Sequence, residues 1–173
     1  MKKTASLKHL LAGIAGIILL LFLDQWTKIS AIAHLKNQAD ISLIPGVFSL
    51  HYLENHGAAF GILQDQQWFF LLLGLIFLVL CTIVYIRMPF TARMMPLRLI
   101  TLAIAAGAIG NMIDRGFRHY VVDFFWFSLI DFPVFNVADI YITVGAVLLV
   151  IFVIFFYKDD ELTFLAPGKG KHV

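Results

Sequence analysis

Four long apolar stretches alternate with more polar segments along the chain. Each stretch has about the 20 residues that a helix needs to cross a bilayer, and charged residues gather toward the ends of the stretches. We therefore predict an all-α membrane protein with four transmembrane helices, at about residues 7–28, 67–87, 97–115 and 136–157. These helices are expected to form one integral membrane domain that covers residues 1–173.

The segments between the helices carry patterns of their own. Residues 41–53 alternate apolar and polar positions after Pro45 and Gly46, which is typical of a short strand with one apolar face. Residues 124–130, FFWFSLI, have too few polar side chains for a freely solvated loop. We expect this second segment to lie at the lipid interface or to cover a groove, as an interfacial loop or helix.

Composition agrees with the membrane assignment. Hydrophobic residues make up 61% of the 173 residues and charged residues only 14%, which is more apolar surface than a soluble core of this size can bury. The net charge is +2 and the basic residues are dispersed, so we expect no nucleic-acid partner. The single Cys81 excludes an internal disulfide and a CxxC metal or redox motif.

The basic residues predict the orientation of the helices. Nine of the 13 lysines and arginines lie in the N-terminal segment, the second connection and the tail: Lys2, Lys3, Lys8, Arg87, Arg93, Arg98, Lys158, Lys169 and Lys171. The positive-inside rule then places both termini, including the tail 158–173, in the cytoplasm. The segments 29–66 and 116–135 are expected outside.

The N-terminus also imitates a secretory signal peptide, because Lys2 and Lys3 precede an apolar run and an A-x-A pattern follows at 31–33. Asp24 and Lys28 make the intervening segment longer and more charged than a usual cleavage region. We expect the first helix to be retained.

Three acidic residues reach one predicted depth. Counting 1.5 Å per residue from the cytoplasmic basic residues places Asp24 and Asp114 about 24 Å, and Asp139 about 28 Å, across the membrane. That level is near the outer edge of a hydrocarbon core of ~30 Å. Placing an ionisable group at that depth costs free energy, and such a group suggests a functional site. We therefore expect a shared site near the extracytoplasmic face.

Polar and small residues recur at helical spacing beside these acids, and residues three or four apart share a helix face. These faces comprise Asp24, Thr27 and Lys28; Gly107, Gly110, Asn111, Asp114 and Arg115; and Asn136, Asp139 and Thr143. The glycines permit close approach of helix backbones. The polar faces are therefore expected to meet.

A purely structural interpretation stays open for these residues. Caps, interhelical hydrogen bonds or an ion pair between Asp114 and Arg115 would hold a bundle together, and Asn136 is most simply an N-cap. Asp123 and Asp139 are harder to explain in this way, since neither has a basic neighbour in sequence. Two carboxyl groups brought together share a proton and supply one base and one acid.

A nucleophilic serine or a catalytic histidine finds no support in the chain. No nucleophile motif contains Ser30, Ser42 or Ser49, and no obvious partner in sequence accompanies His51, His56 or His119.

Five blocks of residues, in order, resemble the motifs of the bacterial lipoprotein signal peptidase (signal peptidase II) family and span most of the chain. They are Asp24-Gln25-Trp26-Thr27-Lys28, Asn55-x-Gly57-x-Ala59-Phe60-Gly61, Gly107-x-x-Gly110-Asn111-x-x-Asp114-Arg115, Val121-Val122-Asp123-Phe124 and Phe135-Asn136-x-Ala138-Asp139. Two small departures stand beside them: His119-Tyr120 where a Gly-aromatic pair is common, and Ile140 where Ser is frequent.

The resemblance implies an intramembrane aspartic endopeptidase of the bacterial cytoplasmic (inner) membrane, with four spanning helices and a small extracytoplasmic β-cradle. Its substrate would be a prolipoprotein that carries diacylglycerol on a cysteine, cut just before that cysteine. Asp123 and Asp139 would be the catalytic pair. We expect a monomer in contact with membrane lipids, without a metal or cofactor.

The resemblance also implies supporting roles. Asn111, Arg115 and Asn136 would position the substrate. Other residues of the matching motifs would organise the site: Asp24, Lys28, Asn55, Gly57, Gly107 and Asp114.

Two other functions remain as alternatives. In a metal-dependent membrane transferase, Asp114, Asp123 and Asp139 would hold Mg²⁺. In a structural or transport bundle, the same acids would relay protons.

Overall fold

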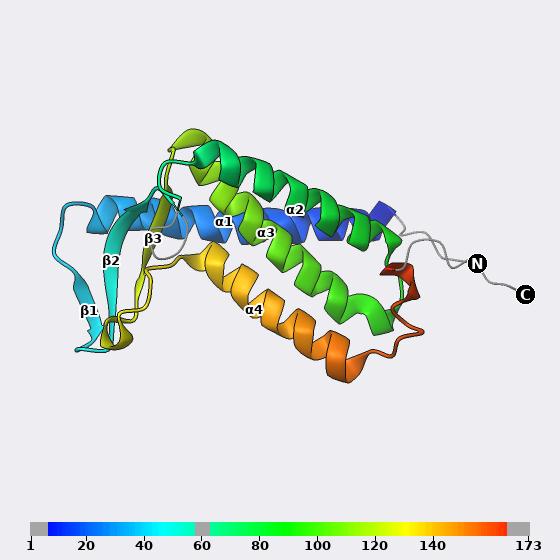
Figure 1. Cartoon of the computed structure of the whole chain (residues 1–173). Helices are drawn as coiled ribbons and strands as arrows, with labels where there is room; N and C mark the ends of the chain where they lie inside the picture. The colour runs from blue at the N-terminus through cyan, green and yellow to red at the C-terminus, as the bar shows by residue number, and fades with distance from the viewer. Residues whose placement is uncertain (1–6, 58–62, 166–173) are drawn as a thin grey trace, which may run out of the picture.

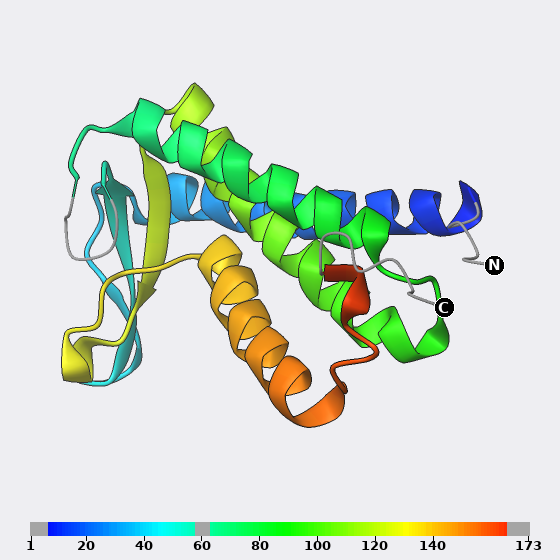
Figure 2. The ribbon, with the colours of Figure 1, turned by 45° about the vertical axis from the view of Figure 1, so that its right-hand side comes forward.

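The computed structural model describes residues 7–57 and 63–165 (Figure 1). Four helices run roughly side by side, with a small sheet at one end of them (Figures 1 and 2). Each helix is long and apolar enough to cross a membrane. They are α1 (Leu7–Leu35), α2 (Gln67–Arg87), α3 (Met95–Phe117) and α4 (Val137–Ile151), the last continued by a π-helical turn η4 (Phe152–Phe156). The predicted four-helix membrane architecture is confirmed.

The first helix continues past its predicted end at residue 28, as far as Leu35. The sequence from 29 to 35 contains no proline or glycine that would stop a helix. Ala31 and Leu35 are buried against Val122 and Phe124 of the sheet. Tertiary packing therefore stabilises a helical extension above the spanning part.

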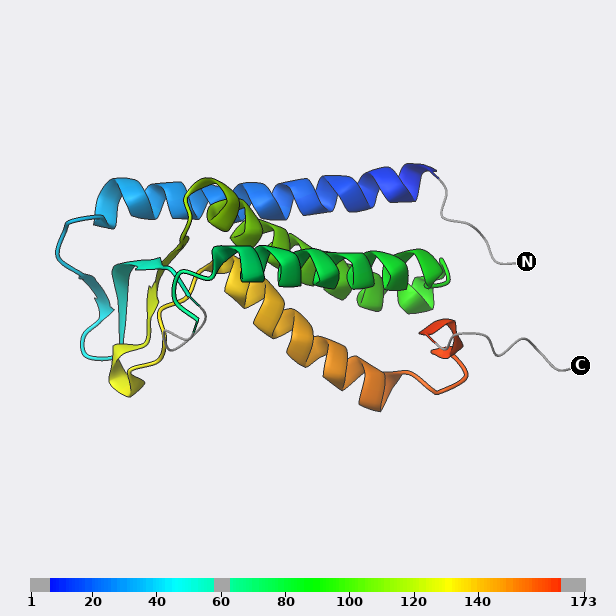
Figure 3. The ribbon, with the colours of Figure 1, turned by 45° about the horizontal axis from the view of Figure 1, so that its top comes forward.

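Helix α3 is the centre of the bundle, and α1, α2 and α4 each pack against it (Figure 3). Its packing with α4 depends on Gly107, because a Cβ there would lie only 2.5 Å from the carbonyl oxygen of Ala138. None of the residues of α2, all of which the structure describes, is buried. The α3–α4 and α1–α3 contacts therefore bring the predicted polar faces together.

The sheet has three antiparallel strands in the order β1-β2-β3: β1 (Ile41–Ile44), β2 (Phe48–Asn55) and β3 (Val121–Trp126). The strand prediction for 41–53 is confirmed as a hairpin. Of residues 124–130, expected as an interfacial loop or helix, the first three complete β3 instead, and the short 3₁₀-helix η3 (Ser128–Ile130) follows. An apolar run of this length reads equally well as a buried strand, and Val122 has no exposed surface.

The opposite end of the bundle closes with an apolar cluster. Its members are Met88, Met94, Leu97, Tyr157 and Phe164. Two short 3₁₀-helices, η2 (Ala92–Met94) and η5 (Thr163–Leu165), supply two of them.

Candidate active site

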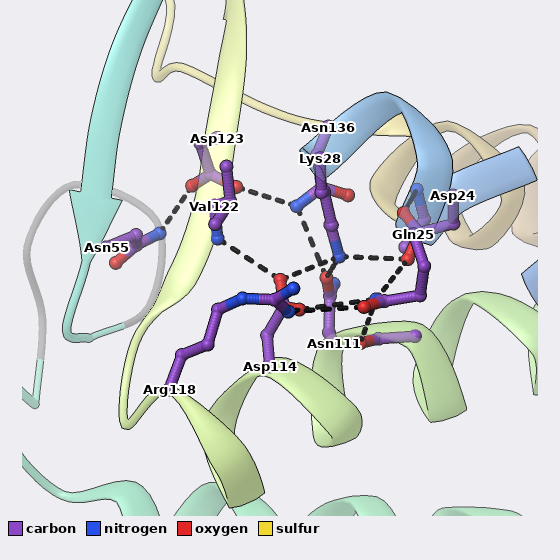
Figure 4. Close-up of polar contacts among 12 residues, drawn as sticks. Asp24, Gln25, Lys28, Asn55, Asn111, Asp114, Arg118, Val122, Asp123 and Asn136 are labelled. Carbon is purple, nitrogen blue, oxygen red and sulfur yellow. Dashed lines mark hydrogen bonds and ion pairs between the residues drawn. The ribbon is translucent and has the colours of Figure 1, made fainter. Parts of the chain in front are cut away.

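Asp123 lies on β3 and is nearly completely buried. The strand is held against α3 because the backbone N–H of Val122 donates to Asp114 Oδ2 (3.2 Å). Both carboxyl oxygens of Asp123 accept from asparagine amides: Asn136 Nδ2 donates to Oδ1 at 2.6 Å and Asn55 Nδ2 to Oδ2 at 2.8 Å (Figure 4). Its orientation is thus set from two other elements.

Asp139 lies in the first turn of α4, where it forms a capping box with Asn136. The backbone N–H of Asp139 donates to Asn136 Oδ1 (3.0 Å) and the backbone N–H of Asn136 donates to Asp139 Oδ2 (3.1 Å). The other carboxyl oxygen accepts from Asn111 Nδ2 of α3 (2.8 Å). Asn136 is therefore an N-cap, as the structural interpretation required, and also a direct link between the two acids.

Both acids line one cavity of about 580 Å³. Its polar end is formed by Asn55, Asn111, Arg115, Asp123 and Asp139. The remaining wall is mostly apolar and comes from the start of β3, the segment after it and the first turns of α4: Val121, Phe127, Ile130, Phe132, Pro133, Val134, Phe135, Ile140, Thr143 and Val144. A polar centre beside an apolar wall is the usual form of a ligand site.

Burial raises the pKa of Asp123 to about 7, and the nearby charge of Asp139 adds to the rise. The amide hydrogen bonds from Asn55 and Asn136 and the charge of Lys28 oppose it. Near neutral pH the Asp123 carboxyl group can therefore either hold or release a proton.

Lys28 is completely buried behind these acids, together with Asp24 and Asp114. Its Nζ lies 3.0 Å from Asp24 Oδ2, 3.0 Å from Asp114 Oδ2 and 2.9 Å from Asn111 Oδ1. Asp24 also accepts from the backbone N–H of Ala138 (3.0 Å), which ties α1 to the start of α4. Each of these buried charges is thus paired and hydrogen-bonded, as burial requires.

The structural alternative of an Asp114–Arg115 ion pair is wrong. Asp114 pairs with Lys28 and with Arg118 instead, since residues four apart share a helix face and adjacent residues do not. Arg115 points to the cavity, donates to the carbonyl of Gly57 (3.1 Å) and lies 4.7 Å from the ring centre of Phe70.

Sequence reasoning missed two members of the network. Gln25 donates to Asp24 (3.0 Å) and Asp114 (3.2 Å), and Arg118 donates to Gln25 Oε1 (3.1 Å). Arg118 could have been found from its spacing of four from Asp114.

Asp24, Lys28 and Asp114 are not among the described residues that line the cavity. The structure therefore separates a layer that faces the cavity from a buried ionic layer behind it. Gly57 contributes through its backbone, because its N–H donates to Asn55 Oδ1 (3.0 Å). In the part of the chain that the structure describes, no cluster of three or more His, Cys, Asp or Glu side chains is arranged to hold a metal.

Two of the histidines do have partners, contrary to the expectation from sequence. His51 Nδ1 lies 2.8 Å from Asp40 Oδ1, and His56 Nδ1 lies 3.5 Å from Asp65 Oδ1. These pairs are solvent-exposed and use neither acid of the cavity.

The signal peptidase (SPase) II family model matches residues 16–155. The chain belongs to the signal peptidase II family. The lipoprotein signal peptidase of Streptococcus thermophilus (strain CNRZ 1066) is 44% identical over 136 residues, which cover 79% of this chain and 88% of that protein. The lipoprotein signal peptidase of Streptococcus pyogenes serotype M5 (strain Manfredo) is 44% identical over 138 residues, covering 80% and 90%.

Solved structures of bacterial membrane enzymes agree with this signal peptidase II assignment. One, solved by the in meso method, superposes with a TM-score of 0.72 at 29% identity and covers 100% of this chain and 99% of that chain. A second has a TM-score of 0.75 at 29% identity, with coverage of 91% and 99%. The resemblance drawn from the five sequence blocks is thus confirmed; positions 58–62, within the second block, lie outside the described residues.

Proposed function

We propose that this signal peptidase II family member is an aspartic endopeptidase that removes signal peptides from diacylglyceryl-modified prolipoproteins, cutting immediately before the lipidated cysteine. Asp123 and Asp139 are its catalytic pair. The observation that carries the proposal is that both carboxyl groups face one cavity and are oriented by asparagine amides from three different segments.

The chemistry follows from a pair that holds one proton. The ionised carboxylate takes a proton from a water molecule as that water attacks the scissile carbonyl carbon. The protonated carboxyl group donates to the carbonyl oxygen, on which negative charge develops. On collapse of the tetrahedral intermediate, the amide nitrogen of the cysteine leaves with a proton from the pair. Arg115 and Asn111, which also line the cavity, position the substrate backbone.

The shape of the cavity supports a lipid-bearing substrate. Its wall is largely apolar, and Ile130 of η3 and Ile140 of α4 are substantially exposed on it. A substrate anchored in the bilayer by its signal peptide and its acyl chains can reach such a wall without leaving the membrane. Enclosure by the segment 127–135 would limit the entry of bulk water.

The proposed topology places the sheet and the cavity at the extracytoplasmic face of the bacterial cytoplasmic membrane, with both termini in the cytoplasm. The basic residues Arg87, Arg93 and Arg98 support it, because they cluster at the end of the bundle away from the sheet. We further propose a monomeric enzyme surrounded by membrane lipids, in one domain.

Cleavage by the purified protein tests the proposal. A synthetic precursor peptide with a diacylglyceryl cysteine is incubated with protein in detergent–lipid micelles, and the products are identified by mass. We expect a cut before the modified cysteine, no cut in the same peptide without lipid, and no effect of a metal chelator.

Two results would contradict the proposal. Activity lost with the chelator and restored by Mg²⁺ would favour the metal-dependent transferase class. Proton flux across vesicles without cleavage would favour a proton-relay bundle.

A further inference from the structure

Lys28 makes three contacts that use all three of its N–H donors. Two go to carboxylates, Asp24 and Asp114, and the third goes to the side-chain oxygen of Asn111 at 2.9 Å. An ammonium group donates and cannot accept. The Asn111 amide must therefore present its oxygen to Lys28 (Figure 4) and its NH₂ group to Asp139, 2.8 Å away.

A flipped Asn111 amide would be strongly disfavoured. Its NH₂ group would face the ammonium of Lys28, donor against donor, and its oxygen would face the carboxyl oxygen of Asp139. The flip would also remove the acceptor of Asn136 Nδ2, which donates to Asn111 Oδ1 at 3.2 Å. Lys28 thus decides which end of this amide meets the catalytic pair.

The other two asparagines around the acids are oriented by the same rule. Asn55 Oδ1 accepts from the backbone N–H of Gly57, and Asn136 Oδ1 accepts from the backbone N–H of Asp139. A backbone N–H is a donor only, so each contact turns the amide nitrogen toward Asp123. Asn111 differs because its amide is oriented by a charged side chain from another helix, Lys28 of α1.

We propose that Lys28 is a positioning residue of the reaction, which acts through Asn111 by aiming the amide N–H of Asn111 at the carboxyl group of Asp139. This inference rests on the proposed function. The buried ionic layer of Asp24, Lys28 and Asp114 then orients a group of the cavity in addition to holding α1 against α3.

The charges around Lys28 favour a directional effect over a long-range one. Asp24 on its own helix and Asp114 on α3 both lie 3.0 Å away, and Arg118 pairs with Asp114 on the far side. The four charges sum to zero, so the effect that the charge of Lys28 has on Asp123 is partly offset by its own partners. The hydrogen bond to Asn111 remains as the specific connection.

A double-mutant cycle tests the proposal. Lys28→Met, Asn111→Leu and the double variant are compared for kcat on the diacylglyceryl precursor peptide, for the pH dependence of kcat, and for melting temperature. We expect Lys28→Met to lower kcat on the order of 100-fold, as a small misplacement of a reacting group does. The double variant should match Asn111→Leu alone, because residues that act as a unit are not additive.

The pH profile separates positioning from plain structural support. Loss of an N–H that donates to a carboxylate disfavours its ionised form, so the acid limb of the Lys28→Met profile should move to higher pH. In the Asn111→Leu background, where only the charge of Lys28 is lost, Lys28→Met should move the acid limb less than it does in the wild-type background. Multiplicative losses of kcat, or an unshifted acid limb, would overturn the proposal.

Lys28→Met leaves buried Asp24 without a cation and Asp114 with Arg118 alone, and a second variant covers failure to fold. Asn111→Asp keeps an oxygen facing Lys28 and both ion pairs, but Asp139 then faces a carboxyl group in place of an amide donor. We expect this variant to fold in detergent, as judged by a cooperative melting transition, with a similar loss of kcat; wild-type kcat would overturn the proposal. Lys36→Met, at an exposed lysine paired with Glu54, is the matched control.

The wild-type protein in the same assay distinguishes failure of the proposed function from failure of the role of Lys28. No cleavage of the lipidated precursor by the wild type would refute the proposed function. Wild-type cleavage with additive effects in the cycle would refute the role of Lys28 alone.

Discussion

Two buried cations, at opposite ends of the bundle, are stabilised in different ways. Lys28, beside the sheet, has no exposed surface and is surrounded by two carboxylates and an amide oxygen. Arg98, at the other end, is 3% exposed. Its guanidinium lies 4.7 Å from the ring centres of both Tyr85 and Phe90 and donates to the carbonyl of Met88.

This difference indicates that the buried cations at the two ends of the bundle serve different purposes. Aromatic faces and a backbone carbonyl hold Arg98 beside the apolar cluster around Met88 and Leu97, and its Nε has no hydrogen-bond partner in the part of the chain that the structure describes. The partners of Lys28 are themselves bonded onward, through Asn111, to the acids of the cavity. A cation held by π-faces stabilises packing, whereas one held by a polar network can also orient reacting groups. The predictions below test this contrast.

The largest expected effect is at the proposed catalytic pair, Asp123 and Asp139. Asp123→Asn or Asp139→Asn should each lower kcat by at least about 10³-fold, the upper part of the range for loss of a general acid or base. Asparagine has nearly the same size, so both variants should remain folded in detergent, as judged by melting temperature. Cleavage retained by either variant would refute the assignment.

Asn136→Ala should come next, because this side chain both caps α4 and donates to Asp123. Loss of the cap costs about 1 kcal/mol of stability. Loss of the amide donor should lower kcat on the order of tenfold, an expectation based on one charge-assisted hydrogen bond of about 1.5 kcal/mol. Both expectations are checked by measuring unfolding and turnover on one preparation. A loss of stability without a change in kcat would show that Asn136 acts only as an N-cap.

The pH dependence should show the raised pKa of Asp123. kcat/KM should fall as pH rises through about 7, because the pair then loses the proton that it donates. Between the ordinary pKa of 3.8 and about 7 the folded state holds a proton that the unfolded state has released, so stability should decrease as pH rises. In Asp123→Asn, the melting temperature should depend less on pH over this range. An equal pH dependence in both proteins would contradict the raised pKa of Asp123.

Arg98→Met should separate the two ends of the bundle. The loss of two aromatic contacts should reduce stability by about 1–2 kcal/mol, with kcat unchanged at a temperature where the variant is folded. A fall in kcat at full stability would show that the two ends are coupled.

The smallest effect is expected for Lys36→Met. This lysine follows α1 directly, and its pair with Glu54 is exposed to solvent (42% and 31%). Exposed ion pairs contribute little, so neither kcat nor melting temperature should change measurably. A loss comparable to that of Lys28→Met would contradict the distinction between buried and exposed lysines.

Much of the architecture follows from local patterns. Runs of about 20 apolar residues predict spanning helices because the bilayer sets their length. Asp123 and Asp139 were recognised as candidate site residues because neither has a basic neighbour in sequence that could pair with it. The sequence did not predict the end of α1 or the third strand, because both depend on tertiary packing among Ala31, Leu35, Val122 and Phe124.

The partners of the polar residues depended on the assembled fold. The sequence allowed Asp114 to pair with adjacent Arg115, while helix geometry and the approach of α1 direct it to Arg118 and Lys28.

Hydrophobic periodicity and residue type are properties of the chain, and they were enough to predict four membrane helices, the signal peptidase II motifs and the two candidate acids. Which donor faces which acceptor depends on the assembled fold. Asn55, Asn111, Asp123 and Asn136 come from four separate segments, and the direction of an amide depends on neighbours that folding brings within 3 Å.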